Sequence, residues 1–156
     1  MQTFLVDTES FLPTMKCLDN KRLGKQRVEG IQIRRALAGK YKRGAWVRHP
    51  AVLMWKGYEN YLDNYIILAC QEWRDRGFMD SVERDLCQEF NTQYNFGIGM
   101  PPFVTPRLVS THRANLYIKD PSHYSERWRR DVYELDSTVC CPSCNYFWPT
   151  HLGATE

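Results

Sequence analysis

The segment from Leu18 to Gly30 constrains the fold more than any other part of the chain. Lysines and arginines crowd this segment, and it holds a single glutamate, Glu29. At about 100° per residue, an α-helix gathers its polar residues on one stripe, while Leu23 and Ile31 point elsewhere. We therefore predict a helix that is held by apolar residues on its other sides and whose charged stripe consists of Arg22, Lys25, Glu29 and Gln32.

Two interpretations of this stripe are open. A carboxylate among cations suits work on a polyanion, because the cations can bind phosphates while the carboxylate serves chemistry at a sugar or base. Alternatively, the stripe is a solvated charged surface on which Glu29 merely pairs with Lys25 at four-residue spacing. The spacing alone does not decide between them.

The size and the charge distribution favour a single domain with one anion-binding face. The chain has 156 residues, so we expect one domain over residues 1–156. Residues 1–50 hold 11 Lys and Arg against 4 Asp and Glu, a net of +7, whereas the remainder holds 10 against 14, a net of −4. A basic N-terminal third on a mildly acidic body is typical of a localised site for a polyanion.

Nothing in the sequence indicates a membrane or a secretion signal. No apolar run approaches the roughly 18 residues of a membrane span, and the start lacks a cationic region followed by an apolar core. We therefore expect a cytoplasmic protein with reduced thiols. Cys17, Cys70 and Cys87 are then expected to be small core residues.

The C-terminal tail carries a possible metal site. Cys141 and Cys144 have the Cys-x-x-Cys separation that lets two thiolates bind one tetrahedral zinc. A second pair of ligands would have to come from Cys140, His123, His151 or another chain. The alternative is that these are free thiols in a loop, so we expect no required cofactor and leave a structural zinc open.

The predicted secondary structure is helical throughout. Apolar residues recur at three- and four-residue steps, and cap residues mark the helix ends. The fold class is therefore all-α: a compact single-domain helical bundle with long irregular loops. The expected segments are an extended arm at 1–9, a helical region at about 10–38 with a break near Asp19, a helix from Pro50 to Gly77, a shorter helix from Asp80 or Ser81 to about Phe90, a loop at 95–103, a last helix from Pro106 to Asp120, and an irregular, aromatic, Cys-containing tail at 125–156.

Several motifs together resemble one family. Leu18-Asp19-x-Lys21-x-Leu23, followed by Glu29-Gly30, resembles the first helix of the pyrimidine-dimer DNA glycosylase, or endonuclease V, family. Further motifs look like a short bacterial and phage branch of it. They are Arg48-His49-Pro50-Ala51-Val52-x-Met54-Trp55-x-Gly57-Tyr58, Arg76-Gly77-Phe78, Ser110-x-His112-Arg113-x-x-Leu116, Lys119-Asp120-Pro121-x-His123-Tyr124 and Tyr146-Phe147-Trp148-Pro149.

The resemblance implies a compact all-helical enzyme that cuts N-glycosidic bonds of damaged or modified bases in DNA. The expected partner is double-stranded DNA that carries such a base, and we expect the protein to be a monomer. In that family the α-amine of the chain attacks the anomeric carbon to give a Schiff base, and β-elimination can then nick the strand, an AP-lyase step. The glutamate that matches Glu29 moves protons and stabilises positive charge at the sugar, and the position of Arg22 contacts DNA near the lesion.

The catalytic residues that follow are Met1 and Glu29. Gln2 is too large for ordinary removal of Met1, so the nucleophile would be the amine of Met1 itself, or else a lysine or water. An α-amine has an ordinary pKa near 8, so roughly a tenth of it is neutral at pH 7. We expect the Met1 nitrogen within about 8 Å of Glu29, across one cleft.

The expected DNA-binding residues are nine cationic or imidazole side chains. His112 would bind a phosphate or orient Glu29, and Arg34 or Arg35 would be structural. Two other classes remain open: a non-catalytic nucleic-acid-binding module, and a small zinc-binding adaptor built on the cysteine tail. The nine residues are Arg22, Lys25, Arg27, Lys40, Lys42, Arg43, Arg48, His112 and Arg113.

Overall fold

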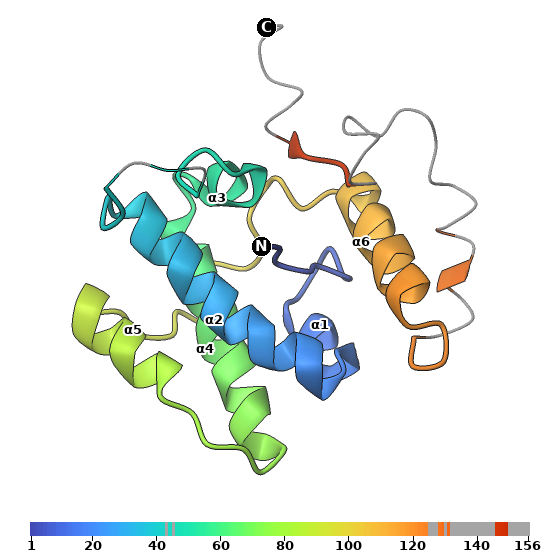
Figure 1. Cartoon of the computed structure of the whole chain (residues 1–156), viewed down its shortest axis with the longest axis horizontal. Helices are drawn as coiled ribbons and strands as arrows, with labels where there is room; N and C mark the ends of the chain where they lie inside the picture. Colours follow the sequence, from blue (N-terminus) through green and yellow to red (C-terminus); the bar gives the residue numbers. More distant parts are fainter. Residues whose placement is uncertain (43, 45, 125–127, 130, 132–145, 150–156) are drawn as a thin grey trace, which may run out of the picture.

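A computed structural model describes residues 1–42, 44, 46–124, 128, 129, 131 and 146–149. These residues form helices and no β-strand, which confirms the all-α fold class. The helices are α1 (Leu12–Cys17), α2 (Asn20–Leu37), α3 (Pro50–Trp55), α4 (Glu59–Asp75), α5 (Val82–Phe90) and α6 (Pro106–Lys119). In Figure 1, α2 crosses in front of α4, α5 flanks the pair on one side, and α6 stands apart on the other.

Helix ends lie where the cap residues predict them. The Asp19 carboxylate accepts the Arg22 N–H at 3.0 Å and begins α2. The Thr105 hydroxyl does the same for α6, and Pro106 occupies the first turn of that helix. The Asp80 carboxylate accepts two N–H groups at the start of α5. These local bonds fix the points at which the chain enters each helix.

The helix predicted between Pro50 and Gly77 is in fact two helices. Helix α3 ends at Trp55, and Gly57 adopts a φ of 84°, a left-handed conformation that is comfortable only for glycine. Three residues therefore turn the chain before α4 begins at Glu59. The turn lets Trp55 and Tyr65 both face the interior, where their side chains are fully buried.

Helices α2 and α4 pack closely because α2 carries glycines on the side that faces α4. A Cβ at Gly30 would lie 2.6 Å from Ile66 Cγ1, and one at Gly24 would lie 3.1 Å from the Trp73 ring. The shared core contains side chains from all six helices and from the N-terminal arm. Its largest fully buried side chains are Leu5, Met15, Leu18, Leu23, Ile33, Trp55, Leu62, Tyr65, Ile66, Leu86, Leu108 and Leu116.

The described cysteines fit the core prediction only in part. Cys70 is fully buried, whereas Cys17 and Cys87 are partly exposed. Burial raises the pKa of the Cys70 thiol above its ordinary value, so this side chain behaves as a small apolar residue. None of the described helices combines the length and the apolar composition needed to cross a bilayer.

Candidate active site

The chain begins with an extended arm, residues 2–6, that runs through the interior between α2 and α6 (Figure 1). A buried extended segment that belongs to no β-sheet needs other hydrogen-bond partners for its backbone N–H and C=O groups. Side chains from α1, α2, α4 and α6 supply them. The bonds are Phe4 N–H to Gln26 Oε1 (2.8 Å), Leu5 N–H to His112 Nδ1 (2.9 Å), Val6 N–H to Thr14 Oγ1 (3.0 Å), Gln26 Nε2 to Gln2 O (3.1 Å) and Arg113 Nε to Val6 O (2.8 Å), with the Tyr65 hydroxyl 2.9 Å from Phe4 O.

This set of bonds fixes the position of the N-terminus. Gln26 is only 1% exposed, and its amide holds both Gln2 and Phe4 against α2. The Trp55 indole N–H donates to the Thr3 hydroxyl at 2.8 Å, so α3 also holds the arm. Because the arm cannot slide without breaking several buried hydrogen bonds, the α-amine of Met1 has a defined place.

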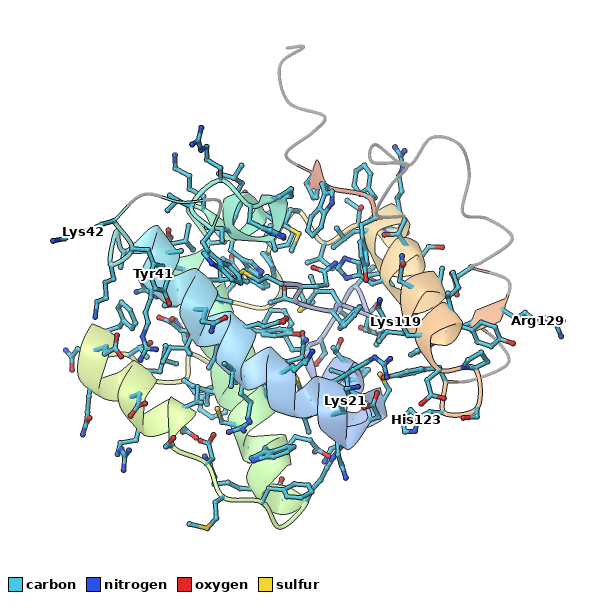
Figure 2. All side chains as sticks on the ribbon, viewed as in Figure 1. Lys21, Tyr41, Lys42, Lys119, His123 and Arg129 are labelled. Carbon is cyan, nitrogen blue, oxygen red and sulfur yellow. The ribbon has the colours of Figure 1, made fainter. Side chains whose placement is uncertain are left out.

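That place is a cleft of about 450 Å³ between α2, α6 and the arm. Four cations and one carboxylate, Glu29, lie among the described lining residues. Figure 2 shows Lys21 on α2 and Lys119 on α6, on facing sides. The lining residues are Met1, Gln2, Phe4, Lys21, Arg22, Lys25, Gln26, Glu29, Lys119 and Tyr146.

Glu29 is bonded directly to the N-terminal arm. The backbone N–H of Gln2 donates to Glu29 Oε2 at 3.0 Å. Three covalent bonds separate the Met1 and Gln2 nitrogens, so the Met1 nitrogen lies within about 7 Å of that carboxylate oxygen. This distance is within the limit of about 8 Å that we expect for two groups acting on one sugar. No ion pair joins Glu29 to Lys25 in the part of the chain that the structure describes.

Arg22 lies in the cleft but is partly engaged. Its guanidinium is 2.6 Å from Asp19 Oδ2 and 5.7 Å from the centre of the Tyr124 ring. Burial raises the pKa of Asp19, but hydrogen bonds from Tyr124 and Arg22 outweigh it and lower that pKa to about 2. Lys25 is exposed and reaches the same cleft one turn further along α2.

Arg27 does not join these cations. It pairs with Asp80 and stacks over Trp73 at 4.5 Å, and its side chain is only 11% exposed. It therefore ties α2 to the start of α5 and is not among the lining residues of the cleft, so its contact with DNA stays a prediction. Arg34 and Arg35 are structural, as expected, because they pair with Asp63 and Glu89.

The other predicted cations that the structure describes lie away from the cleft lining. Lys40 pairs with Glu89 at 2.8 Å, and Lys42 lies at the other end of α2 from Lys21 (Figure 2). Arg48 is exposed before α3. Arg113 uses its Nε to hold the arm. Arg43 lies outside the described residues.

His112 is completely buried, so its ring does not reach the surface at which the expected phosphate contact would form, and that contact stays a prediction. Its Nδ1 accepts the Leu5 N–H, and its Nε2 lies 3.3 Å from the Gln2 amide. Burial lowers its pKa to about 3, and it is neutral in neutral solution. The other expectation, that it orients Glu29, is compatible with this position because Gln2 bonds to both residues.

Sequence reasoning missed several cleft residues. Lys21 precedes the predicted Lys25 by four residues on α2, so helical spacing could have added it to the charged stripe. Gln26 and Gln2 gave no signal, because a glutamine that binds buried backbone looks like any surface glutamine. Lys119 and Tyr146 come from distant segments that only the folded chain brings to the cleft.

The predicted zinc ligands Cys141 and Cys144 lie outside the described residues. Among the residues that are described, no three His, Cys, Asp or Glu side chains gather closely enough to hold a metal ion.

Comparison with known families identifies the chain. The family model for pyrimidine dimer DNA glycosylase matches residues 1–86, which include the arm, the helix with Glu29 and the helices that pack against it. Comparisons with curated proteins and with solved structures give no match. The matched segment is more than half of the chain and contains most of the cleft, so the protein belongs to the pyrimidine dimer DNA glycosylase family.

Proposed function

We propose that the protein removes a damaged base from double-stranded DNA through attack by the Met1 α-amine on the anomeric carbon of the nucleotide, with Glu29 assisting. The hydrogen bond from Gln2 N–H to Glu29 Oε2 carries this proposal. It sets the chain's own amine beside the one carboxylate among the described lining residues of the cleft.

In the first step the neutral amine donates its electron pair to C1′ of the sugar. The N-glycosidic bond breaks, and the base leaves with the bonding electrons and takes up a proton. The amine then loses a proton. The C1′–O4′ bond breaks as the nitrogen electron pair forms the C=N bond, O4′ leaves with the bonding electrons and takes up a proton from water, and an iminium links residue 1 to the opened sugar. No metal or redox partner is needed to balance this step.

Glu29 is suited to support the charge that develops in this step. Its Oε2 accepts the Gln2 N–H, while no hydrogen bond among the described residues uses its Oε1. A carboxylate held in this way faces an oxocarbenium or iminium without having to reorganise. It can also take up the proton that the attacking amine releases.

The cations of the cleft would hold the DNA backbone around the extruded nucleotide. Lys21, Lys25 and Lys119 make no ion pair within the described part of the chain, so their ammonium groups are available to phosphates. The attacked bond is not reachable inside a duplex, so the nucleotide must leave the stack. Phe4 and Tyr146 offer aromatic surface on the cleft wall.

Strand cleavage would follow from the same intermediate. An iminium at C1′ acidifies the hydrogen on C2′, and loss of that proton expels the 3′ phosphate by β-elimination. Glu29, next to residue 1, is the candidate base. An AP-lyase activity is therefore part of the proposal.

Borohydride trapping tests the nucleophile. The protein must begin at Met1 without a leader or tag remnant, because each added residue moves the amine by up to about 3.5 Å. With abasic-site duplex and borohydride we expect a covalent adduct, and after trypsin the sugar should be on the peptide 1–16. An otherwise identical protein with one extra N-terminal glycine is the control, and it should trap poorly.

Each alternative gives a different result. A sugar attached to Lys21, Lys25 or Lys119 would show that this lysine, and not the Met1 amine, is the nucleophile. Base release without any adduct would indicate water as the nucleophile. DNA binding with neither release nor adduct would indicate a binding module without catalysis. The substrate panel should include duplexes with pyrimidine dimers, other damaged bases and modified bases.

A further inference from the structure

His112 holds two points of the N-terminal arm at once. It comes from α6, it is completely buried, and its two ring nitrogens face Leu5 and Gln2. Its ring also meets Phe4 and Tyr146 edge to face, with centroids 6.0 and 5.6 Å apart. The imidazole is thus locked in place behind two residues that line the cleft.

The hydrogen bonds determine which ring nitrogen carries the proton. Nδ1 accepts the Leu5 N–H at 2.9 Å, so it has no proton of its own. A neutral imidazole then carries its proton on Nε2, which is a donor. A donor requires an acceptor, so the Gln2 amide must present its oxygen to His112 Nε2. This orientation follows from a half-turn of the amide, which exchanges its oxygen and nitrogen without moving other atoms. In the opposite orientation Gln2 Oε1 is buried without any partner.

Residue 2 is therefore held from two helices. On the α2 side, its N–H binds Glu29 and its carbonyl accepts from Gln26. On the α6 side, its side chain binds His112. The Met1 amine is only three covalent bonds from the Gln2 nitrogen, so the position of residue 2 limits where the amine can meet a sugar.

We propose that His112 is a positioning residue for the N-terminal amine, acting through the side chain of Gln2. This inference rests on the proposed function, in which that amine is the nucleophile. His112 touches no substrate. It fixes residue 2 so that the Gln2 N–H stays on Glu29 and the amine stays beside the same carboxylate.

The two ring nitrogens can be tested separately. Asparagine at position 112 places its amide oxygen near the place of Nδ1, so it can still accept the Leu5 N–H, but it cannot reach Gln2. Glutamine at this position reaches the place of Nε2 and leaves the Leu5 N–H without a partner. His112→Asn therefore removes the positioning contact and keeps the contact that supports the fold.

The partner variant is Gln2→Met, which keeps the length of the side chain and removes its amide. Alanine is unsuitable because a small second residue permits removal of Met1, so mass spectrometry must confirm that Met1 remains. For both His112→Asn and Gln2→Met we expect a loss of about 10-fold or more in single-turnover borohydride trapping. DNA affinity should change by less than about twofold, because no phosphate contact is altered.

Two further measurements separate positioning from general instability. The double variant should trap no more slowly than either single variant, because both remove one contact. The backbone amide resonance of Gln2, which reports its bond to Glu29, should shift in His112→Asn. Leu86→Ala, a cavity in the core at α5, is the control: it should lower stability and leave the trapping rate unchanged.

The outcomes of the two proposals can be told apart. If the wild-type protein gives no adduct at all, the proposed nucleophile is wrong, and the Gln2 resonance still tests whether His112 fixes residue 2. If the wild type traps and His112→Asn traps at the same rate with an unchanged Gln2 resonance, the positioning role is overturned. Should His112→Asn not fold, an unchanged trapping rate in Gln2→Met overturns it equally.

Discussion

Replacing Glu29 by glutamine removes one negative charge from the cleft and leaves nearly everything else in place. The side chain keeps its length, and its amide oxygen can still accept the Gln2 N–H that now binds Oε2 at 3.0 Å. The arm should therefore stay where it is. The neutral acceptor is weaker than the carboxylate, so we expect a loss of about 1 kcal/mol in the free energy of unfolding.

The effect on catalysis should be much larger. A full positive charge about 4 Å from a carboxylate is stabilised by about 4 kcal/mol at an effective dielectric constant of about 20. The transition state of base release carries part of such a charge, so we expect a loss of about 3 kcal/mol, which is roughly 100-fold in rate. DNA affinity should be kept or slightly raised, because a negative charge near the phosphates is gone.

Single-turnover base excision, with protein in excess over a lesion-bearing duplex, measures this rate without product release. Glu89→Gln is the matched control, because it removes a carboxylate that pairs with Arg35 and Lys40 away from the cleft. It should leave the rate unchanged. If Glu29→Gln excises the base at the wild-type rate, Glu29 has no catalytic role in base release.

Three other perturbations have defined outcomes. Lys25→Ala and Lys119→Ala should each lower the log–log slope of DNA affinity against salt concentration by about 0.9, because each removes one phosphate contact in the cleft. Lys40→Ala, which removes a lysine paired with Glu89, should leave this slope unchanged. Equal slopes in all three variants would contradict the assignment of the cleft as the DNA site. Gly30→Ala should reduce the free energy of unfolding by about 1–3 kcal/mol in urea denaturation, because its Cβ would lie 2.6 Å from Ile66 Cγ1. Burial lowers the pKa of His112 from 6.5 to about 3, so as the pH falls the unfolded chain takes up a proton before the folded protein does. The free energy of unfolding should therefore decrease as the pH drops from 6.5 towards 3, and His112→Asn should flatten this part of the pH–stability curve. An unchanged curve would mean that the imidazole of His112 is not the group responsible.

The helices could be predicted from the sequence because local interactions determine where they begin and end. Asp19, Asp80 and Thr105 each accept N–H groups a few residues ahead, so the chain around them carries the whole signal. The stripe with Arg22, Lys25 and Glu29 was equally local, since helical spacing alone places these residues together. The prediction of one helix from Pro50 to Gly77 missed the turn at Gly57. The apolar pattern continues through this turn, although Gly57 has a positive φ that ends the helix.

The cleft itself depends on contacts between residues far apart in the sequence. His112 meets residues that precede it by 107 and 110 positions, and no periodicity encodes such a pairing. Arg27 and Lys25 look alike in sequence, yet Asp80 engages the first and leaves the second free to face the cleft.

The sequence by itself therefore determined the helical elements, the charged stripe and the family resemblance, because each is written in neighbouring residues. Only the tertiary structure decided that the arm at residues 2–6 is buried with Gln2 bonded to Glu29, that His112 supports this arm from the interior, and which cations line the cleft. The backbone N–H and C=O groups of a buried extended arm need hydrogen-bond partners, and side chains of α2, α4 and α6 can supply them only after these helices have packed together.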